Sequence, residues 1–390
     1  MELQKRNILI LSIAQGLSIT STSINMINTG LVGALLASDP AYATIPLSLQ
    51  FLTIAISLIP VSLLMGKIGR RPMFLLGALS AFLGCLIIAF SIFNKSFYLF
   101  ILGSVFLGFS QANQQFYRYA AADNASDKLK SKAISLVLAG GLVAAILGPE
   151  VSRYSFDIFP QYIYLGTYLF AALIQIFNII VLIFVKIEKP KKSSAILRPL
   201  MTILMQKTLV VAILAAAVGY SLMSFIMTAT PLQIVNISKL GNSASATVIQ
   251  WHIIAMFAPS FFTGSIISFF GSRKVMLIGV LLYSFSIFFG LLGQSVQHFW
   301  VALFLCGLGW NFLYVGGSDI IAKSALPEER AKVQGVTDFI IFVFVALGSY
   351  LAGILHSNMG WETLLVYAII PIVILFLSIM LIKPKEFKLG

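Results

Sequence analysis

Six ionisable side chains within or directly beside long apolar runs of this 390-residue chain are candidates for chemistry. A charge within a membrane is costly, so residues of this kind usually mark a substrate, ion or proton pathway. An arginine is a permanent cation that can pair with a carboxylate, whereas carboxylates and imidazoles can also carry protons. The six residues are Arg118, Asp123, Glu150, His252, Asp319 and Asp338.

Three of these groups are candidates for proton coupling, namely Asp319, Asp338 and His252. An imidazole titrates near neutral pH, although His252 could also be a satisfied interior histidine. Asp338 could instead bond its own backbone or a neighbouring hydroxyl group. For Arg118 and Asp319, the alternative to a functional pair is that each side chain snorkels outward from the end of its helix.

The elements that position these groups follow from composition. The chain is 59% hydrophobic and only 10% charged, whereas a soluble protein carries about 25% charged residues. A water-soluble globule, a nucleic-acid binder and a disordered chain are therefore excluded. Cys85 and Cys306 both lie in apolar runs and are interpreted as small hydrophobic residues, so we expect no disulfide, metal site or cofactor.

The apolar runs are long and continuous, which predicts an all-α membrane protein with twelve spanning helices rather than the alternating strands of a barrel. The runs cover residues 7–37, 43–65, 73–92, 97–122, 131–152, 161–185, 208–236, 244–269, 274–293, 298–322, 331–355 and 361–383.

The distribution of cations predicts the orientation. If both termini are cytoplasmic, all but four of the 26 Lys and Arg residues lie on the cytoplasmic side or at the cytoplasmic ends of the spans. The exceptions are Lys95, Arg153 and Lys239 outside and Arg118 within a span. This asymmetry follows the positive-inside rule, so the net charge of +13 is a topology signal.

The chain has the organisation of a duplication. A polar stretch at 186–207 divides it into six-helix halves at 1–185 and 208–390, and we expect this stretch to be a cytoplasmic linker. A shift of about 201 residues places Gly108 on Gly309 and Arg118 on Asp319. Two halves related by a pseudo-twofold repeat are therefore predicted.

Two loops carry related motifs, at 62–71 (SLLMGKIGRR) and 264–274 (GSIISFFGSRK). Together with the twelve spans and the repeat, they resemble the major facilitator superfamily, whose loop pattern is G-x-x-x-D-R-x-G-R-[RK]. Ser62, Gly66 and Ser268 depart from that pattern. The resemblance implies helix turns at Gly69 and Gly271, followed by the surface cations Arg70, Arg71 and Arg273, with Arg70 pairing with Asp123.

The fifth span contains Gly140, Gly141, Gly148 and Pro149. It resembles the glycine-rich motif of the superfamily's antiporters, in which small residues let the fifth helix pack on a neighbour from the other half. This partial match favours export over import. Close packing without a role in direction is the alternative.

In the family, the first, fourth, seventh and tenth helices line the central cavity, and polar side chains gather in the corresponding runs of this chain. The 201-residue shift places Arg118 on Asp319, in the fourth and tenth helices, so we expect the two side chains to face each other across that pathway as a gate. The candidate substrate or gate residues are Asn28, Gln115, Arg118, Asn311, Tyr314 and Asp319.

We therefore expect a monomeric secondary active transporter of the bacterial inner membrane that moves a small organic molecule by alternating access, coupled to protons. Export of a drug or metabolite is favoured, and proton-coupled import of a nutrient or organic anion is the alternative. A lipid-handling protein, a membrane enzyme or a sensor on the same fold is a further alternative. The three scattered histidines supply no catalytic cluster, and the absence of a nucleotide-binding motif argues against ATP as the energy source.

Overall fold

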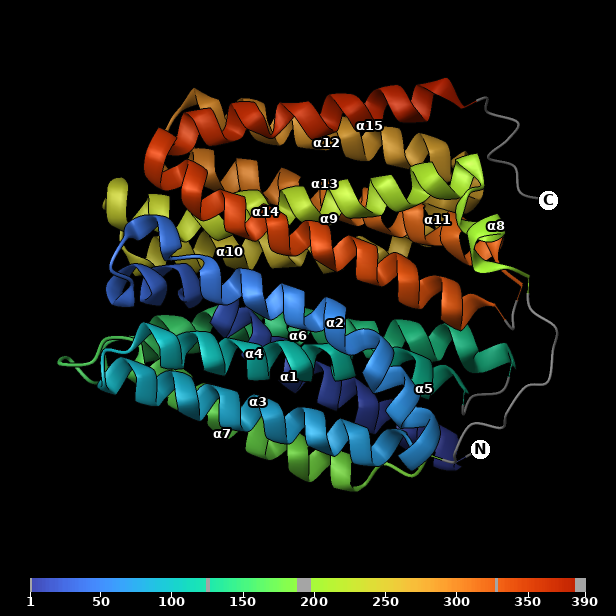
Figure 1. Ribbon diagram of the computed structural model, residues 1–390, viewed down its shortest axis with the longest axis horizontal. Coiled ribbons are helices and arrows are strands. Elements are labelled where there is room, and N and C mark those ends of the chain that lie inside the picture. The colour runs from blue at the N-terminus through green and yellow to red at the C-terminus, as the bar shows by residue number, and fades with distance from the viewer. Residues whose placement is uncertain (1, 124–126, 188–197, 327–328, 383–390) are drawn as a thin grey trace. The chain divides into compact units, whose positions relative to one another are not determined.

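The computed structural model describes residues 2–123, 127–187, 198–326 and 329–382, which are helical and contain no strand (Figure 1). This part of the chain forms two compact units. The first comprises Met1–Lys191 and Ser245–Gln250, and the second comprises Lys192–Ala244 and Trp251–Gly390.

The first unit contains seven α-helices and one short 3₁₀ turn among its described residues. They are α1 (Glu2–Leu36), the turn η1 (Pro40–Tyr42), α2 (Ile45–Ile68), α3 (Arg70–Phe93), α4 (Phe97–Gln114), α5 (Tyr117–Asp123), α6 (Asp127–Ser155) and α7 (Leu165–Ile183).

The second unit begins with a short helix at the end of the linker and continues with the C-terminal half. Its elements are α8 (Leu200–Leu204), α9 (Lys207–Pro231), the π-helical segment η2 (Leu232–Ile237), α10 (Asn242–Phe257), α11 (Ser260–Phe270), α12 (Ser272–Leu292), α13 (Val296–Ser324), α14 (Arg330–Tyr367) and α15 (Ile369–Leu381). The segment Ser245–Gln250 of α10 is counted with the first unit.

The packing of the helices repeats between the two units. In the first unit α1 packs on α6, α3 on α4, and α3 on α7. In the second unit the corresponding pairs are α9 with α14, α12 with α13, and α12 with α15. These three corresponding pairs support the duplication inferred from the 201-residue shift.

Each of the twelve predicted apolar runs falls on a helix or a pair of helices. The fourth run is divided into α4 and α5, because the N–H of Phe116 bonds to the carbonyl of Asn113, three residues back. The eighth run is bent by 43° between α10 and α11. The last two runs lie in α14 and α15, and Gly360, with φ of 81° and ψ of 177°, separates them.

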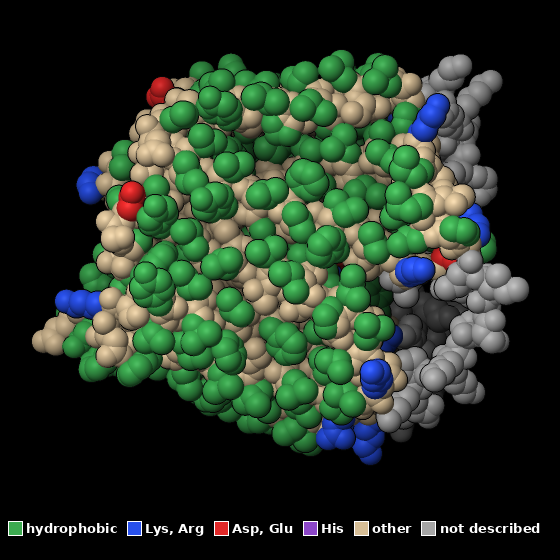
Figure 2. Space-filling view, in the orientation of Figure 1, with side chains coloured by type: hydrophobic (Ala, Val, Ile, Leu, Met, Phe, Trp, Pro, Cys, Tyr) green, Lys and Arg blue, Asp and Glu red, His purple; other side chains and the backbone are tan. Residues whose placement is uncertain are grey.

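By length and composition, eight of the described helical stretches could cross a membrane, and the bent pair α10–α11 would make a ninth. The stretch Lys332–Leu381 counts as one of the eight although Gly360 divides it. Figure 2 shows hydrophobic side chains spread over the visible face, with Lys and Arg only toward its edges. This surface is suited to a hydrocarbon environment.

Two glycines allow consecutive helices to meet in sharp turns. Gly69 joins α2 to α3 with φ of 96°, and Gly271 joins α11 to α12 with φ of 82°. Positive φ angles of this size are strained for residues with a side chain, which explains glycine at both positions. The tight turns predicted at Gly69 and Gly271 are therefore confirmed.

Candidate functional site

A small polar pocket lies inside the first unit, between α1, α2, α3 and α4. Hydroxyl and amide side chains supply most of its lining, and no ionised side chain contributes. The lining residues are Ser18, Ser21, Thr22, Gln50, Ala81, Leu107, Ser110, Gln111 and Gln114. The pocket is thus built for an uncharged group that forms hydrogen bonds.

Two glutamines of the pocket have an amide atom without a partner in the described part of the chain. Tyr168 donates to Asn25 Oδ1 (3.0 Å), and Asn25 Nδ2 donates to Gln50 Oε1 (2.6 Å), which leaves Gln50 Nε2 as an unused donor. Gln111 Nε2 donates to Thr22 Oγ1 (2.9 Å), which leaves Gln111 Oε1 as an unused acceptor. Both side chains are buried.

Gln50 is not among the site residues predicted from the sequence. Its signal was available, because it is an amide within the predominantly apolar run at 43–65. A polar side chain in such a run needs a partner from another helix or a ligand. The choice between those two outcomes requires the tertiary structure.

An aromatic cluster occupies the interior of the second unit. Trp310 and Tyr314 of α13 are stacked, with ring centroids 5.1 Å apart and an interplanar angle of 10°. Tyr220 of α9 meets both rings edge-on, at 5.5 and 5.6 Å, and Phe342 of α14 lies 5.4 Å from Tyr220. Phe257 of α10 approaches Trp310 at 6.0 Å. The candidate residue Tyr314 is therefore one wall of a larger aromatic cluster.

Trp310 also carries an unused polar group. Only 6% of this residue is exposed, and its indole N–H has no hydrogen-bond partner among the described residues. A buried donor without an acceptor is costly, so a ligand acceptor at this position would be stabilising. The cluster thus combines flat aromatic surface with one directed donor.

Arg118 and Asp319 each have partners within their own unit. Arg118 Nη2 donates to the hydroxyl of Tyr119 (3.1 Å), and the guanidinium lies 4.8 Å from that ring's centroid. Asp319 Oδ2 accepts from Ser272 Oγ (2.6 Å) and from Lys323 Nζ (2.8 Å). The gate between Arg118 and Asp319 remains a prediction.

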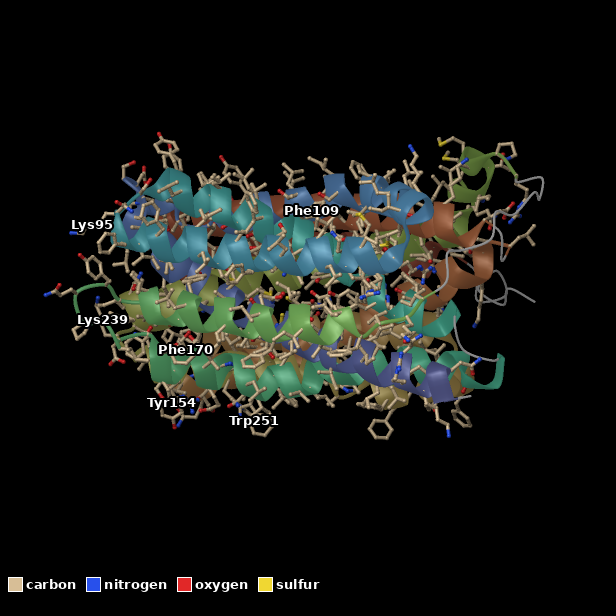
Figure 3. The ribbon with its side chains drawn as sticks, turned by 90° about the horizontal axis from the view of Figure 1, so that it is seen from below. Lys95, Phe109, Tyr154, Phe170, Lys239 and Trp251 are labelled. Carbon is tan, nitrogen blue, oxygen red and sulfur yellow. The ribbon has the colours of Figure 1, made fainter. Side chains whose placement is uncertain are left out.

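The other proton-coupling candidates differ in burial. His252 is fully buried in α10, where its Nδ1 contacts the carbonyl of Leu303 at 2.7 Å and its Nε2 has no partner in the described chain. The preceding residue, Trp251, projects away from the ribbon (Figure 3). Asp338 of α14 is half-buried. Among the residues that the structure describes, no three His, Cys, Asp or Glu side chains gather as a metal site.

The predicted polar candidates take part in helix packing. Asn28 of α1 exchanges hydrogen bonds with Ser152 of α6, at 2.8 and 3.0 Å. Asn311 of α13 accepts from Thr263 Oγ1 (2.6 Å) and donates to Ser260 Oγ (2.7 Å) and to the carbonyl of Met256 (2.8 Å). Asn311 therefore braces the bend between α10 and α11.

Gln115 lies at the junction of α4 and α5 and is half-buried.

The cations of the two motif loops differ in their surroundings. Arg273 Nε donates at 3.4 Å to the carbonyl of Ile379, in the last turn of α15, where a cation interacts favourably with the helix dipole. Arg71 is exposed at the start of α3. The predicted pair of Arg70 and Asp123 remains a prediction, because the Asp123 side chain lies outside the described residues.

Two glycines of the fifth span lie against the backbone of α1. A Cβ on Gly140 would lie 2.7 Å from the carbonyl oxygen of Ser12 and 2.8 Å from the nitrogen of Gly16, and a Cβ on Gly148 would lie 2.6 Å from Ser23. These two glycines thus pack on α1 of the same unit, and packing of the fifth span on a helix of the other half remains a prediction. Close backbone approach explains these two glycines without reference to transport direction.

Gly141 and Pro149, the other predicted members of the packing motif, are both buried in α6.

An ion pair that was not predicted from the sequence joins Arg198, near the end of the linker, to Glu329. Glu329, only 2% exposed, accepts from the backbone N–H and the Nε of Arg198 (3.0 and 2.9 Å), and from Arg198 Nη2 (2.5 Å). The N–H of Leu326 donates to the same carboxylate (3.1 Å). These hydrogen bonds, those from the Arg198 side chain above all, lower the pKa of Glu329 to about 2. The linker's C-terminal end is thereby attached to the second unit.

Comparison with known proteins identifies the family. The Major Facilitator Superfamily matches residues 11–251 and 209–389. The chain belongs to this superfamily. It is 41% identical, over 98% of its length and 97% of the relative's, to the riboflavin transporter RfnT of Brucella anthropi. It is 27% identical to the MFS-type transporter YddS of Bacillus subtilis, over 85% of this chain and 81% of that protein.

A solved structure from the superfamily supports the fold. A bacterial homologue of the human lysosomal transporter Spinster, in an inward-facing and occupied conformation, aligns with a TM-score of 0.75 and 14% identity. The alignment covers 97% of both chains. The chain is therefore a transporter with the twelve-helix fold of the major facilitator superfamily, as the sequence predicts.

Proposed function

We propose that this transporter takes up riboflavin. The observation that carries the proposal is the 41% identity with the riboflavin transporter RfnT, which extends over nearly the whole of both chains. Riboflavin is an uncharged, three-ring heteroaromatic molecule with a hydroxylated side chain, and it is a nutrient. The comparison therefore favours the alternative expectation, nutrient import, over the export suggested by the partial glycine motif of the fifth span.

The aromatic cluster of the second unit fits the flavin ring. Stacking of a planar heterocycle on an aromatic side chain contributes about 1–3 kcal/mol. Trp310 and Tyr314 offer parallel rings, and the unused indole N–H of Trp310 could donate to a ring carbonyl or nitrogen. The cluster has no charge in its described members, which suits a neutral ring.

We further propose that uptake is proton-coupled, with Asp319, Asp338 and His252 as the candidate groups. An ionisable residue within a membrane helix is a recurring component of proton relays. Asp319 accepts from Ser272 and Lys323, so loss of its charge would weaken above all the ion pair with Lys323. We expect the positive-inside distribution to place both termini in the cytoplasm of a bacterial cell.

Uptake can be tested in two steps. The transporter should rescue growth of a bacterium that can neither synthesise riboflavin nor import it, at micromolar riboflavin. Purified protein in liposomes should then accumulate labelled riboflavin, faster when the outside is acidic than when the gradient is collapsed with an ionophore. Failure of both rescue and accumulation would refute riboflavin as the substrate. Accumulation at the same rate with and without the proton gradient would refute only the proton coupling.

A further inference from the structure

The small polar pocket of the first unit has a hydrogen-bonding capacity that the protein itself does not use. Gln50 is fully buried and Gln111 is 8% exposed, and both line the pocket. Leaving a buried polar atom without a partner costs about 1–3 kcal/mol. One such atom could be tolerated as a packing imperfection, but two in the same pocket indicate a bound group.

The direction of each free hydrogen bond follows from its neighbours. The chain Tyr168–Asn25–Gln50 uses the oxygen of Gln50, so Gln50 presents an N–H to the pocket. Gln111 uses its nitrogen on Thr22, so it presents an oxygen. Gln50 and Gln111 therefore present one donor and one acceptor to the pocket, beside the amide of Gln114 and the hydroxyls of Ser18, Ser21 and Ser110.

An alcohol hydroxyl matches this arrangement. It can accept from Gln50 Nε2 and donate to Gln111 Oε1 at the same time, whereas a carbonyl only accepts and an ammonium only donates. A phosphate or carboxylate would find no cation in the lining. The small size of the pocket suits a CH–OH unit rather than an aromatic ring.

We propose that this pocket binds the hydroxylated ribityl chain of riboflavin and thereby distinguishes flavins that carry the chain from those that lack it. The inference rests on the proposed function, since riboflavin is the hydroxyl-bearing solute considered. It assigns Gln50 and Gln111 as specificity-determining residues of the first unit.

The test compares riboflavin with lumiflavin, which has the same ring but a methyl group in place of the ribityl chain. Gln50→Met and Gln111→Met keep the side-chain length and remove the amide. In proteoliposomes, each variant should raise the KM for riboflavin about tenfold, as expected for one lost hydrogen bond to a ligand, while the inhibition constant of lumiflavin stays within twofold of wild type.

Gln175→Met is the matched control, because Gln175 is equally buried in the same unit but lies outside the pocket. Its KM for riboflavin should change less than twofold. If the Met variants do not fold, Ser110→Ala removes a smaller pocket hydroxyl and should raise the KM for riboflavin roughly twofold to threefold, again without affecting lumiflavin.

The outcomes separate the two proposals. Suppose that the wild type transports riboflavin, but the pocket variants raise the KM for riboflavin and the inhibition constant of lumiflavin equally, or change neither. The pocket assignment is then overturned and the transport function stands. The same conclusion follows if Gln175→Met behaves like the pocket variants. If wild type does not transport riboflavin, both proposals fail.

Discussion

The two units place different chemistry on the same duplicated scaffold. Under the 201-residue shift, Phe109 of α4 corresponds to Trp310 of α13, and Asn113 corresponds to Tyr314. Around α4 the interior is a pocket of amides and hydroxyls, whereas around α13 it is a cluster of aromatic rings. Three pairs of neighbouring helices nevertheless correspond between the units. Duplication thus preserved backbone packing and left the interior side chains free to diverge.

The substitution with the largest expected effect tests the close helix packing that the two units share. Gly140→Leu should prevent accumulation of folded transporter, because even a Cβ at this position would overlap backbone atoms of Ser12 and Gly16. Gly335→Leu is the matched change in α14, where a Cβ meets nothing within 4 Å. Fluorescence-detected gel filtration and thermal unfolding in detergent measure both. Similar yields for the two variants would show that α1 and α6 can separate without cost.

The divergence of the interiors is tested by aromatic substitutions. Trp310→Ala should raise the KM for riboflavin about tenfold or more, since it removes a stacking surface worth about 1–3 kcal/mol. Trp300→Ala is a control on the same helix, because Trp300 also stacks on an aromatic ring, Phe304, at 5.4 Å and 13°. Phe109→Ala, labelled in Figure 3, changes the duplicated position in the first unit.

Both control variants should stay within about threefold of wild type if the aromatic function belongs to the second unit alone. A loss at Phe109 equal to that at Trp310 would contradict the comparison. Trp310→Phe separates the two contributions of the indole, because it keeps a flat ring and removes the N–H.

The sequence predicted the scaffold better than the interior. Apolar runs, the repeat and the turn glycines are local signals, so the spans and the turns at Gly69 and Gly271 could be located without a structure. The role of Asn311 could not, because its three partners belong to other helices. The same holds for Gln50, whose free N–H follows from contacts with Asn25 and Tyr168.

The ion pair of Arg198 and Glu329 is the clearest example of a contact that could not be predicted from the sequence. The two residues lie 131 positions apart, and no motif connects them.

The smallest expected effect on transport concerns this ion pair, which attaches the end of the linker to the second unit. The pKa of Glu329 is lowered from 4.5 to about 2, so the ionised, bonded form should persist as the pH falls from 7 to 4 and be lost only near pH 2. Glu329→Gln should increase amide hydrogen exchange at 198–205 severalfold at pH 7. Riboflavin uptake should change less than twofold.

Wild-type exchange at 198–205, corrected for the intrinsic effect of pH, should be the same at pH 7 and pH 4. A fall in protection between these values would mean that the carboxylate is protonated earlier than its hydrogen bonds imply.

The attachment of the linker at both ends sets the contour length of the tether between the units. At its start, Asn7 Nδ2 donates to the carbonyl of Lys186 (2.6 Å), and the N–H of Lys186 donates to Asn7 Oδ1 (3.2 Å). At its end, Glu329 holds Arg198. The segment from Lys186 to Arg198 can extend to roughly 40 Å at most. This length is the most that the linker can span between its two anchors, and shortening the segment residue by residue would measure how much of it transport requires.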